Sequence, residues 1–132
     1  MNRPLRIVVA DDEADMRDYF ARVLPRLGHS VVAVAESGEE LLAQCRAARP
    51  DLVITDVKMP GLSGFEAAQH LHEELSLPVL LVTAHPDREL LQRAETDYRM
   101  CYLVKPIKQA DLSPAIVRTM NRFVEAEAAR SS

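Results

Sequence analysis

Polar side chains at the ends of several apolar runs of this chain are of the kinds that bind and transfer a phosphoryl group. They are Asp11, Asp12, Asp56, Thr83 and Lys105. Three carboxylates held close together repel one another, and a hard divalent cation such as Mg²⁺, which takes oxygen ligands, removes that repulsion. An ammonium and a hydroxyl beside the cation would bind phosphoryl oxygens, and a carboxylate can accept the phosphoryl group as an acyl phosphate. Such chemistry requires a fold that brings these side chains together.

Alternating strand-like and helix-like segments predict such a fold. Apolar and β-branched runs predict strands over 5–10, 30–35, 51–56, 78–84 and 100–104. Apolar residues at helical spacing predict helices over 16–27, 37–48, 62–75, 86–97 and 109–129. Pro86 is expected near the start of its helix, and Pro114 is expected in the first turn of the last helix, which would therefore begin near Asp111.

Four of the five predicted strands are nearly continuous apolar runs, which is typical of a parallel sheet covered by helices on both faces, an α/β fold. Ligands of such open sheets bind outside the carboxyl ends of the strands. Each polar side chain named above follows or ends a predicted strand, so we expect all of them on one rim of the sheet. Taken singly, each is also an ordinary cap or turn residue. Such residues occur at the ends of four strands on one rim, which four unrelated caps and turns would explain only by coincidence. We therefore favour a phosphoryl site.

Length and composition fit one domain that spans residues 1–132. The chain has 132 residues, a net charge of −4 and 27% charged residues, which predict neither direct nucleic acid binding nor membrane binding. Cys45 and Cys101 lie in no paired motif, so we expect reduced thiols rather than a disulfide. No apolar run is long enough for a signal peptide or a membrane span, which favours a cytoplasmic location.

Four motifs together resemble the receiver domain of two-component response regulators. They are VVADDE (8–13), DVKMPGLSG (56–64), LLVTAH (80–85) and YLVKP (102–106). The resemblance covers about residues 5–125, the expected core of the domain. It implies a flavodoxin-like (βα)5 fold, in which a five-stranded parallel sheet has the strand order 2-1-3-4-5, and a signalling role in a phosphorelay.

The resemblance implies a role for each polar group of the rim. Asp56 would accept the phosphoryl group from a sensor histidine kinase or a phosphotransfer protein in an Mg²⁺-dependent reaction. Asp12, Asp56 and the backbone carbonyl of Lys58 would bind Mg²⁺ directly, and Asp11 would act mostly through a bound water. Lys105 would contact the phosphoryl oxygens, and the Lys105–Pro106 bond would be cis.

The resemblance also implies how phosphorylation changes the molecule. Thr83 would move toward the phosphoryl group, and Tyr102 would change rotamer with it. The surface formed by the predicted helix 86–97, the strand 100–104 and the helix after it would change as a result. That surface would control an output domain or partner, and we expect it to form homodimers.

Two basic residues would flank the phosphoryl group. Lys58 and His85 lie two residues beyond Asp56 and Thr83. They would influence how fast water reaches the phosphoryl group, and therefore its lifetime. The segment 95–100 departs from the family pattern, because many receivers carry a Gly-Ala pair there.

Two other classes of protein fit the residues less well. A phosphatase of the haloacid dehalogenase type would carry a second acid two residues after its nucleophile, where this chain has Lys58. A flavodoxin-like cofactor carrier would share the sheet, but the acidic rim would repel a flavin phosphate. We therefore expect a chain that assists its own phosphoryl transfer and dephosphorylation, and that is not a turnover enzyme.

The route by which the signal leaves the chain stays open. The chain could be a complete single-domain regulator or a fragment that lacks a C-terminal output domain. Residues 101–116, with a helix that continues to 129, are also similar to the receivers of RNA-binding transcription antiterminators, in which this helix leads to an output helix bundle. The sequence identifies neither the kinase nor the stimulus.

Overall fold

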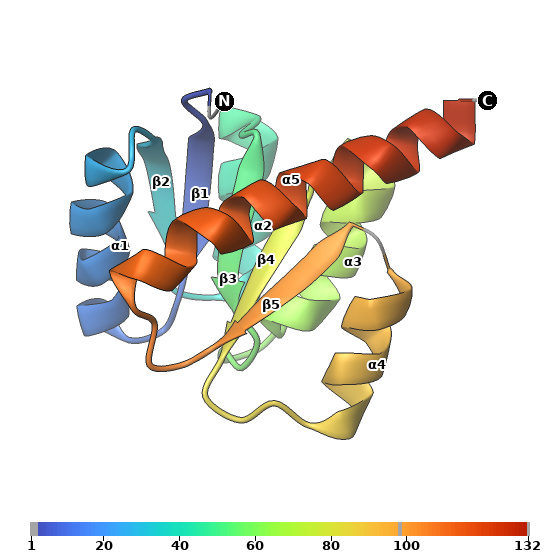
Figure 1. Cartoon of the computed structure of the whole chain (residues 1–132). Helices are drawn as coiled ribbons and strands as arrows, with labels where there is room; N and C mark the ends of the chain where they lie inside the picture. The colour runs from blue at the N-terminus through green and yellow to red at the C-terminus, as the bar shows by residue number, and fades with distance from the viewer. Residues whose placement is uncertain (1–2, 98, 132) are drawn as a thin grey trace.

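Strands and helices alternate five times over the described residues, 3–97 and 99–131 of this computed structural model, with side chains described through Ala129 (Figure 1). The strands are β1 (Arg6–Ala10), β2 (Ser30–Ala35), β3 (Leu52–Asp56), β4 (Val79–Thr83) and β5 (Met100–Val104). The helices are α1 (Ala14–Arg26), α2 (Gly38–Ala48), α3 (Gly64–Leu75), α4 (Arg88–Thr96) and α5 (Gln109–Ser131). Every predicted element overlaps an observed one, and the bounds of β2 and β5 match the prediction.

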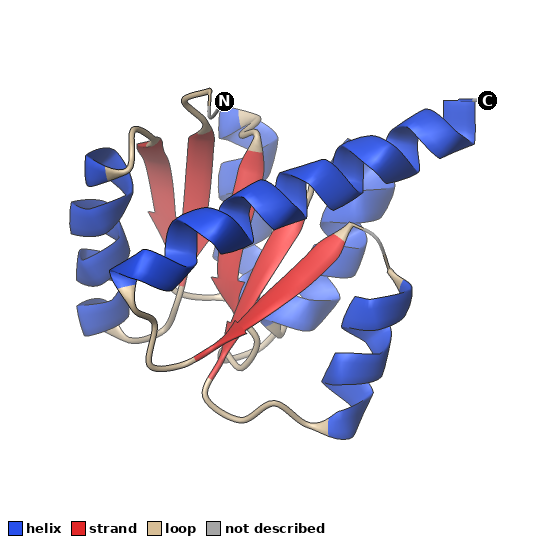
Figure 2. Ribbon diagram, viewed as in Figure 1, coloured by secondary structure: helices blue, strands red, loops and turns tan. Residues whose placement is uncertain are grey.

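The five strands form one parallel sheet in the order β2-β1-β3-β4-β5, which confirms the predicted fold (Figure 2). Ala10 lies opposite Thr55, Asp56 lies opposite Val82, and Thr83 lies opposite Val104. The carboxyl ends of the four strands that carry the polar residues therefore meet at one edge of the sheet. The strand order reverses between β1 and β3, and ligands of such sheets bind at this kind of reversal.

Two separate layers of apolar side chains hold the helices on the sheet. On one face, α1 and α5 pack against alternate strand residues; on the other face, α2, α3 and α4 do the same. Figure 1 shows α5 lying across the near face of the sheet, with its C-terminal part continuing past the sheet. Every residue of β3 and β4 is buried, since helices cover both of their faces.

Polar caps set the first residues of three helices. The Ser37 side chain accepts a hydrogen bond from the backbone of Glu40, and Ser63 and Glu66 form a capping box at the start of α3. Asp87 accepts from the backbone N–H of Leu90 at 2.8 Å and so begins α4 at the next residue. Pro86 therefore precedes α4, which corrects the prediction that it lies inside the helix.

The last helix starts at the first residue of the predicted range 109–129, so the start near Asp111 inferred from Pro114 is two residues too late. The helix begins at Gln109, which places Pro114 in the second turn. A proline there removes one intrahelical hydrogen bond, because it has no backbone N–H. The fully buried Leu112 and the nearly buried Ile116 fix this part of α5 on the sheet, so tertiary packing outweighs the lost bond.

A buried histidine joins α3 to the segment before β5. His72 is 2% exposed, and its Nδ1 lies 3.5 Å from Oδ2 of Asp97. Asp97 also accepts hydrogen bonds from the backbone N–H and the Nε–H of Arg99, at 3.0 and 3.3 Å. Burial alone would raise the pKa of Asp97, but the contacts with His72 and Arg99 outweigh it and lower the pKa well below its usual range. Tyr98, part of the segment where a Gly-Ala pair was expected, lies outside the described residues.

Both cysteines are free and buried, which confirms the expectation that Cys45 and Cys101 form no disulfide. Burial raises the pKa of Cys45 to about 12. None of the helices in the described ranges combines the length and the apolarity that crossing a membrane requires.

Candidate functional site

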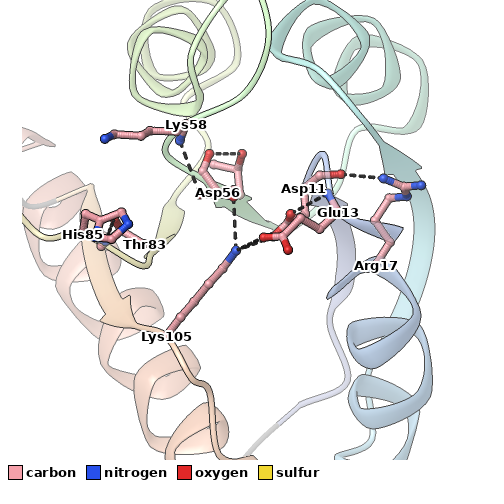
Figure 3. Close-up of polar contacts among 9 residues, drawn as sticks. Asp11, Glu13, Arg17, Asp56, Lys58, Thr83, His85 and Lys105 are labelled. Carbon is pink, nitrogen blue, oxygen red and sulfur yellow. Dashed lines mark hydrogen bonds and ion pairs between the residues drawn. The ribbon is translucent and has the colours of Figure 1, made fainter. Parts of the chain in front are cut away.

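The amine of Lys105 contacts carboxylates at the carboxyl ends of β1 and β3 (Figure 3). Its Nζ lies 3.1 Å from Oδ2 of Asp11, 3.2 Å from Oδ2 of Asp56 and 3.4 Å from Oε1 of Glu13. The Lys105 side chain is only 12% exposed. Burial lowers the pKa of Lys105, but Asp11 and Asp56 outweigh burial and raise it. The ammonium is therefore charged at neutral pH and neutralises part of an acidic group.

Asp11 is the most deeply buried carboxylate of the rim, and its side chain is 1% exposed. Its Oδ1 accepts a hydrogen bond from the backbone N–H of Glu13 at 2.9 Å. Burial raises the pKa of Asp11, and the negative charge of Asp56 acts in the same direction, while Glu13 N–H and Lys105 oppose them. A cation near Asp11 would therefore relieve an unfavourable buried charge.

Backbone bonds hold Asp56 in place at the end of β3. Its carbonyl accepts from the Thr55 hydroxyl at 3.0 Å, and its Oδ1 accepts from the backbone N–H of Lys58 at 3.3 Å. The next residue, Val57, donates its N–H to the carbonyl of Val82 at 3.2 Å. Both carboxylate oxygens of Asp56 are thus oriented, one by Lys58 and the other by Lys105.

Four acidic residues of the rim could hold a metal ion. Asp11, Asp12, Glu13 and Asp56 each offer one carboxylate oxygen, and these oxygens all lie within 4.8 Å of one another. An all-oxygen, acidic donor set suits Mg²⁺, and the exposure of Asp12 and Glu13 leaves room for waters in the coordination shell. The residues present therefore fit the cation that the sequence predicts.

Sequence reasoning missed Glu13 as a member of this group. Its carboxylate is 66% exposed, yet it reaches both the acidic group and Lys105. The only signal was the run of three acids at 11–13. Arg17 was also missed: its guanidinium donates to the carbonyl of Asp11 at 2.8 Å and pairs with Glu36 at 2.9 Å, which ties the loop after β1 to the loop after β2.

The hydroxyl of Thr83 lies at the end of β4 and is buried. It accepts a hydrogen bond from the backbone N–H of His85 at 3.1 Å, and among the described residues no acceptor takes its own hydrogen. The Thr83 carbonyl accepts from the backbone N–H of Lys105 at 2.8 Å. The Lys105–Pro106 bond that follows is cis, as the resemblance implies.

A cavity of about 260 Å³ opens over the rim. Its lining includes the predicted residues Asp12, Asp56, Lys58, Thr83, His85 and Lys105, together with Glu13 and Ala84. Lys58 and His85 are exposed on the same side of the cavity (Figure 3). Tyr102 does not line the cavity. Tyr102 is on β5, opposite Leu81 of β4, and is half-buried against the apolar layer under α2, α3 and α4.

A protein-family model and a curated protein both match most of this chain. The family model described as the response regulator receiver domain matches residues 7–117. The chain is 39% identical over 122 residues to the transcriptional regulatory protein PdtaR of Mycobacterium tuberculosis, which is 92% of this chain and 60% of PdtaR. The chain thus spans less than two thirds of the length of this curated relative.

Solved structures of similar fold cover most of the chain. A response regulator receiver domain protein from Clostridium thermocellum is 33% identical, with a TM-score of 0.76, and the match covers 89% of this chain and 94% of that one. The chemotaxis protein CheY4 of Vibrio cholerae is 28% identical, with a TM-score of 0.79, over 89% of this chain and 99% of that one. The residues matched by the family model, 7–117, include the strand ends that carry the acidic group.

Proposed function

This chain belongs to the response regulator receiver domain family, and on that basis we propose that Asp56 accepts a phosphoryl group in an Mg²⁺-dependent reaction. The observation that carries the proposal is the position of Lys105, which lines the open cavity and whose amine contacts both Asp11 and Asp56. One ammonium among four acids leaves an excess of negative charge that a divalent cation would offset. Bound Mg²⁺ would neutralise charge on the transferred group.

The residues of this chain would orient both partners of the transfer. A carboxylate oxygen of Asp56 forms the new O–P bond, while the P–N bond to a histidine of the donor protein breaks and that imidazole regains a proton. Lys105, freed in part from Asp56, would bind the phosphoryl oxygens, and the Thr83 hydroxyl has a hydrogen to donate to them. Asp11, Asp12 and the Lys58 carbonyl would hold the cation. The protein contributes mainly position and electrostatic stabilisation.

Phosphoryl transfer to Asp56 can be tested by intact mass after incubation with acetyl phosphate and Mg²⁺. We expect one phosphoryl adduct on the wild-type chain and none on Asp56→Asn. Asp18→Asn, which removes an exposed carboxylate from α1, is the matched control and should keep the adduct. No adduct on the wild-type chain at any Mg²⁺ concentration, or an adduct that survives in Asp56→Asn, would show the proposal to be wrong.

We further propose that the chain does not turn over a substrate as a phosphatase does. The position two residues after Asp56 is Lys58, whose exposed amine lines the cavity where a hydrolase would need an acid. Lys58 and His85, which both line the cavity, would instead influence how fast water reaches the phosphoryl group and therefore set its lifetime. Steady release of many phosphates per chain from a small phosphomonoester would contradict this part of the proposal.

The proposed partners are a phosphoryl donor and an output. The donor would be a histidine kinase or a phosphotransfer protein, and the output would be reached through the surface of α4, β5 and α5. Thr83 lies next to β5 in the sheet, and Tyr102 on β5 is half-buried, so a shift of Thr83 has a short path to that surface. Homodimer formation through this surface and a cytoplasmic location remain predictions.

A further inference from the structure

The loop after Asp56 is bonded to a distant acidic residue that takes no part in the chemistry above. This loop, residues 57–63, joins β3 to α3 and carries the Lys58 carbonyl. Glu39 is the second residue of α2, and its Oε1 accepts a hydrogen bond from the backbone N–H of Leu62 at 2.5 Å. We infer that Glu39 is a positioning residue that holds the 57–63 loop in the shape that binds Mg²⁺, an inference that rests on the function proposed above.

The hydrogen bond between Glu39 and Leu62 differs from the interactions that an acid in the first turn of a helix usually makes. Such an acid normally compensates the helix dipole or bonds back to a backbone N–H of its own helix end. In α2 the cap is supplied by Ser37, which accepts from the backbone N–H of Glu40 at 3.2 Å. The Glu39 carboxylate instead crosses to a residue 23 positions away in sequence. Its specific partner is therefore the loop.

The loop is shaped to fit this carboxylate. Gly61 has a φ of 70°, and a Cβ on it would lie 2.7 Å from Oε1 and 2.9 Å from Oε2 of Glu39. A Cβ on Gly38, the residue before Glu39, would overlap the backbone carbonyl of Leu62. The start of α2 and the second half of the loop therefore touch backbone to backbone, with a charge-assisted hydrogen bond across the contact.

Two anchors then hold the part of the loop that directly follows Lys58. Met59, directly after Lys58, is 8% exposed and belongs to the apolar layer under α2 and α3. Leu62, three residues further on, is held by Glu39. With the second anchor removed, residues 60–62 would sample more conformations, and binding of a cation would have to order them. The Lys58 carbonyl belongs to the peptide group that joins Lys58 to Met59, next to this segment, so its position would be less well fixed.

Four variants of the full 132-residue chain separate reach from charge. Glu39→Ala removes the contact, Glu39→Gln keeps an acceptor oxygen at the same reach, and Glu39→Asp keeps the charge but is one methylene shorter. Glu40→Ala is the matched control, since it removes the same charge from the same exposed turn. Mg²⁺ affinity is measured by isothermal titration calorimetry, and amide hydrogen exchange of residues 57–63 is measured without Mg²⁺. Thermal unfolding reports whether each variant is folded.

A positioning role predicts that reach matters more than charge. Glu39→Ala and Glu39→Asp should weaken Mg²⁺ binding about tenfold, the lower end of what loss of an outer partner costs a metal site. The Leu62 amide should exchange faster in both variants. The Mg²⁺ affinity of Glu39→Gln should stay within about threefold of the wild-type value, and that of Glu40→Ala should equal the wild-type value. If Glu39→Ala failed to fold, the comparison of the Gln and Asp variants would still decide.

Either of two results would overturn the inference. In the first, Glu39→Asp has the Mg²⁺ affinity of the wild type and Glu39→Gln has that of Glu39→Ala, which would show that the charge of Glu39 matters and its reach does not. In the second, Glu39→Ala and Glu40→Ala have equal Mg²⁺ affinity and equal exchange at Leu62. The proposed function fails separately, when the wild-type chain takes up no phosphoryl group on Asp56, because hydrogen exchange at Leu62 does not depend on that reaction.

Discussion

Replacing Lys105 by Met tests whether a single ammonium balances the acids of the rim. Methionine has a similar length and no charge, so Asp11 and Asp56 would lose a partner that lies 3.1 and 3.2 Å away. Removing one partner of a buried ion pair costs about 3–5 kcal/mol, whereas exposed pairs contribute less than about 1 kcal/mol. These three side chains are largely buried but lie beside an open cavity, so we expect the free energy of unfolding to fall by about 2 kcal/mol. For a chain of this length that corresponds to a fall in Tm of about 8 °C.

Added Mg²⁺ should recover much of that loss. A cation that binds only the folded chain stabilises it in proportion to the logarithm of its concentration over Kd. The ammonium of Lys105 occupies the same carboxylates that the cation needs, so the Lys105→Met chain should bind Mg²⁺ more tightly than the wild type. The difference in Tm should therefore narrow as Mg²⁺ rises. Differential scanning calorimetry over a Mg²⁺ series measures both the loss and its recovery.

The control for Lys105→Met is Lys108→Met. Lys108 is an exposed lysine of the same loop and lies outside the cavity lining, so its replacement makes the same change in net charge away from the acids. Its Tm should stay within about 2 °C of the wild type, because exposed substitutions usually change stability by no more than about 0.5 kcal/mol. A Tm difference for Lys105→Met that Mg²⁺ does not alter would refute the idea that ammonium and cation compete for the same carboxylates.

Two further predictions concern partly or fully buried titratable groups. The pKa of Asp97 is lowered by folding, so its contribution to stability is complete above the ordinary value of 3.8 and is lost as the pH falls through the lowered value. After allowance for solvent screening, Asp97→Asn should cost about 1 kcal/mol near neutral pH and progressively less in strong acid, as measured by urea unfolding. Burial raises the pKa of Cys45 to about 12, so iodoacetamide at about pH 8 should modify Cys45 only in the unfolded chain, as read by peptide mass mapping.

Much of the rim could be predicted because it depends on strand ends alone. Once 5–10, 51–56 and 100–104 are assigned to parallel strands, the residues that end or directly follow these strands must lie at one edge of the sheet. Asp11, Asp56 and Lys105 meet there for that reason. The strand order and the cis bond at Pro106 followed from the resemblance to the receiver family and agree with the structure.

The parts that escaped prediction depend on contacts between distant segments. Nothing in the periodicity of α2 distinguishes Glu39 from Glu40, because only the folded loop presents the N–H of Leu62 to one and not to the other. The position of Pro114 in the second turn of α5 escaped for a similar reason. The local rule for Pro114 favours a later start, and the packing of Leu112 against the sheet overrides it. Glu13 escaped because its own neighbours suggest an ordinary helix start.

The two apolar layers on opposite faces of the sheet share strands but no side chains. Neighbouring residues of β5 illustrate this separation, since Tyr102 packs into the layer under α2, α3 and α4, whereas Leu103 packs into the layer under α1 and α5. Substitutions that share no partners usually have additive effects on stability. Two core substitutions, one in each layer, should therefore lower the free energy of unfolding by the sum of their separate effects.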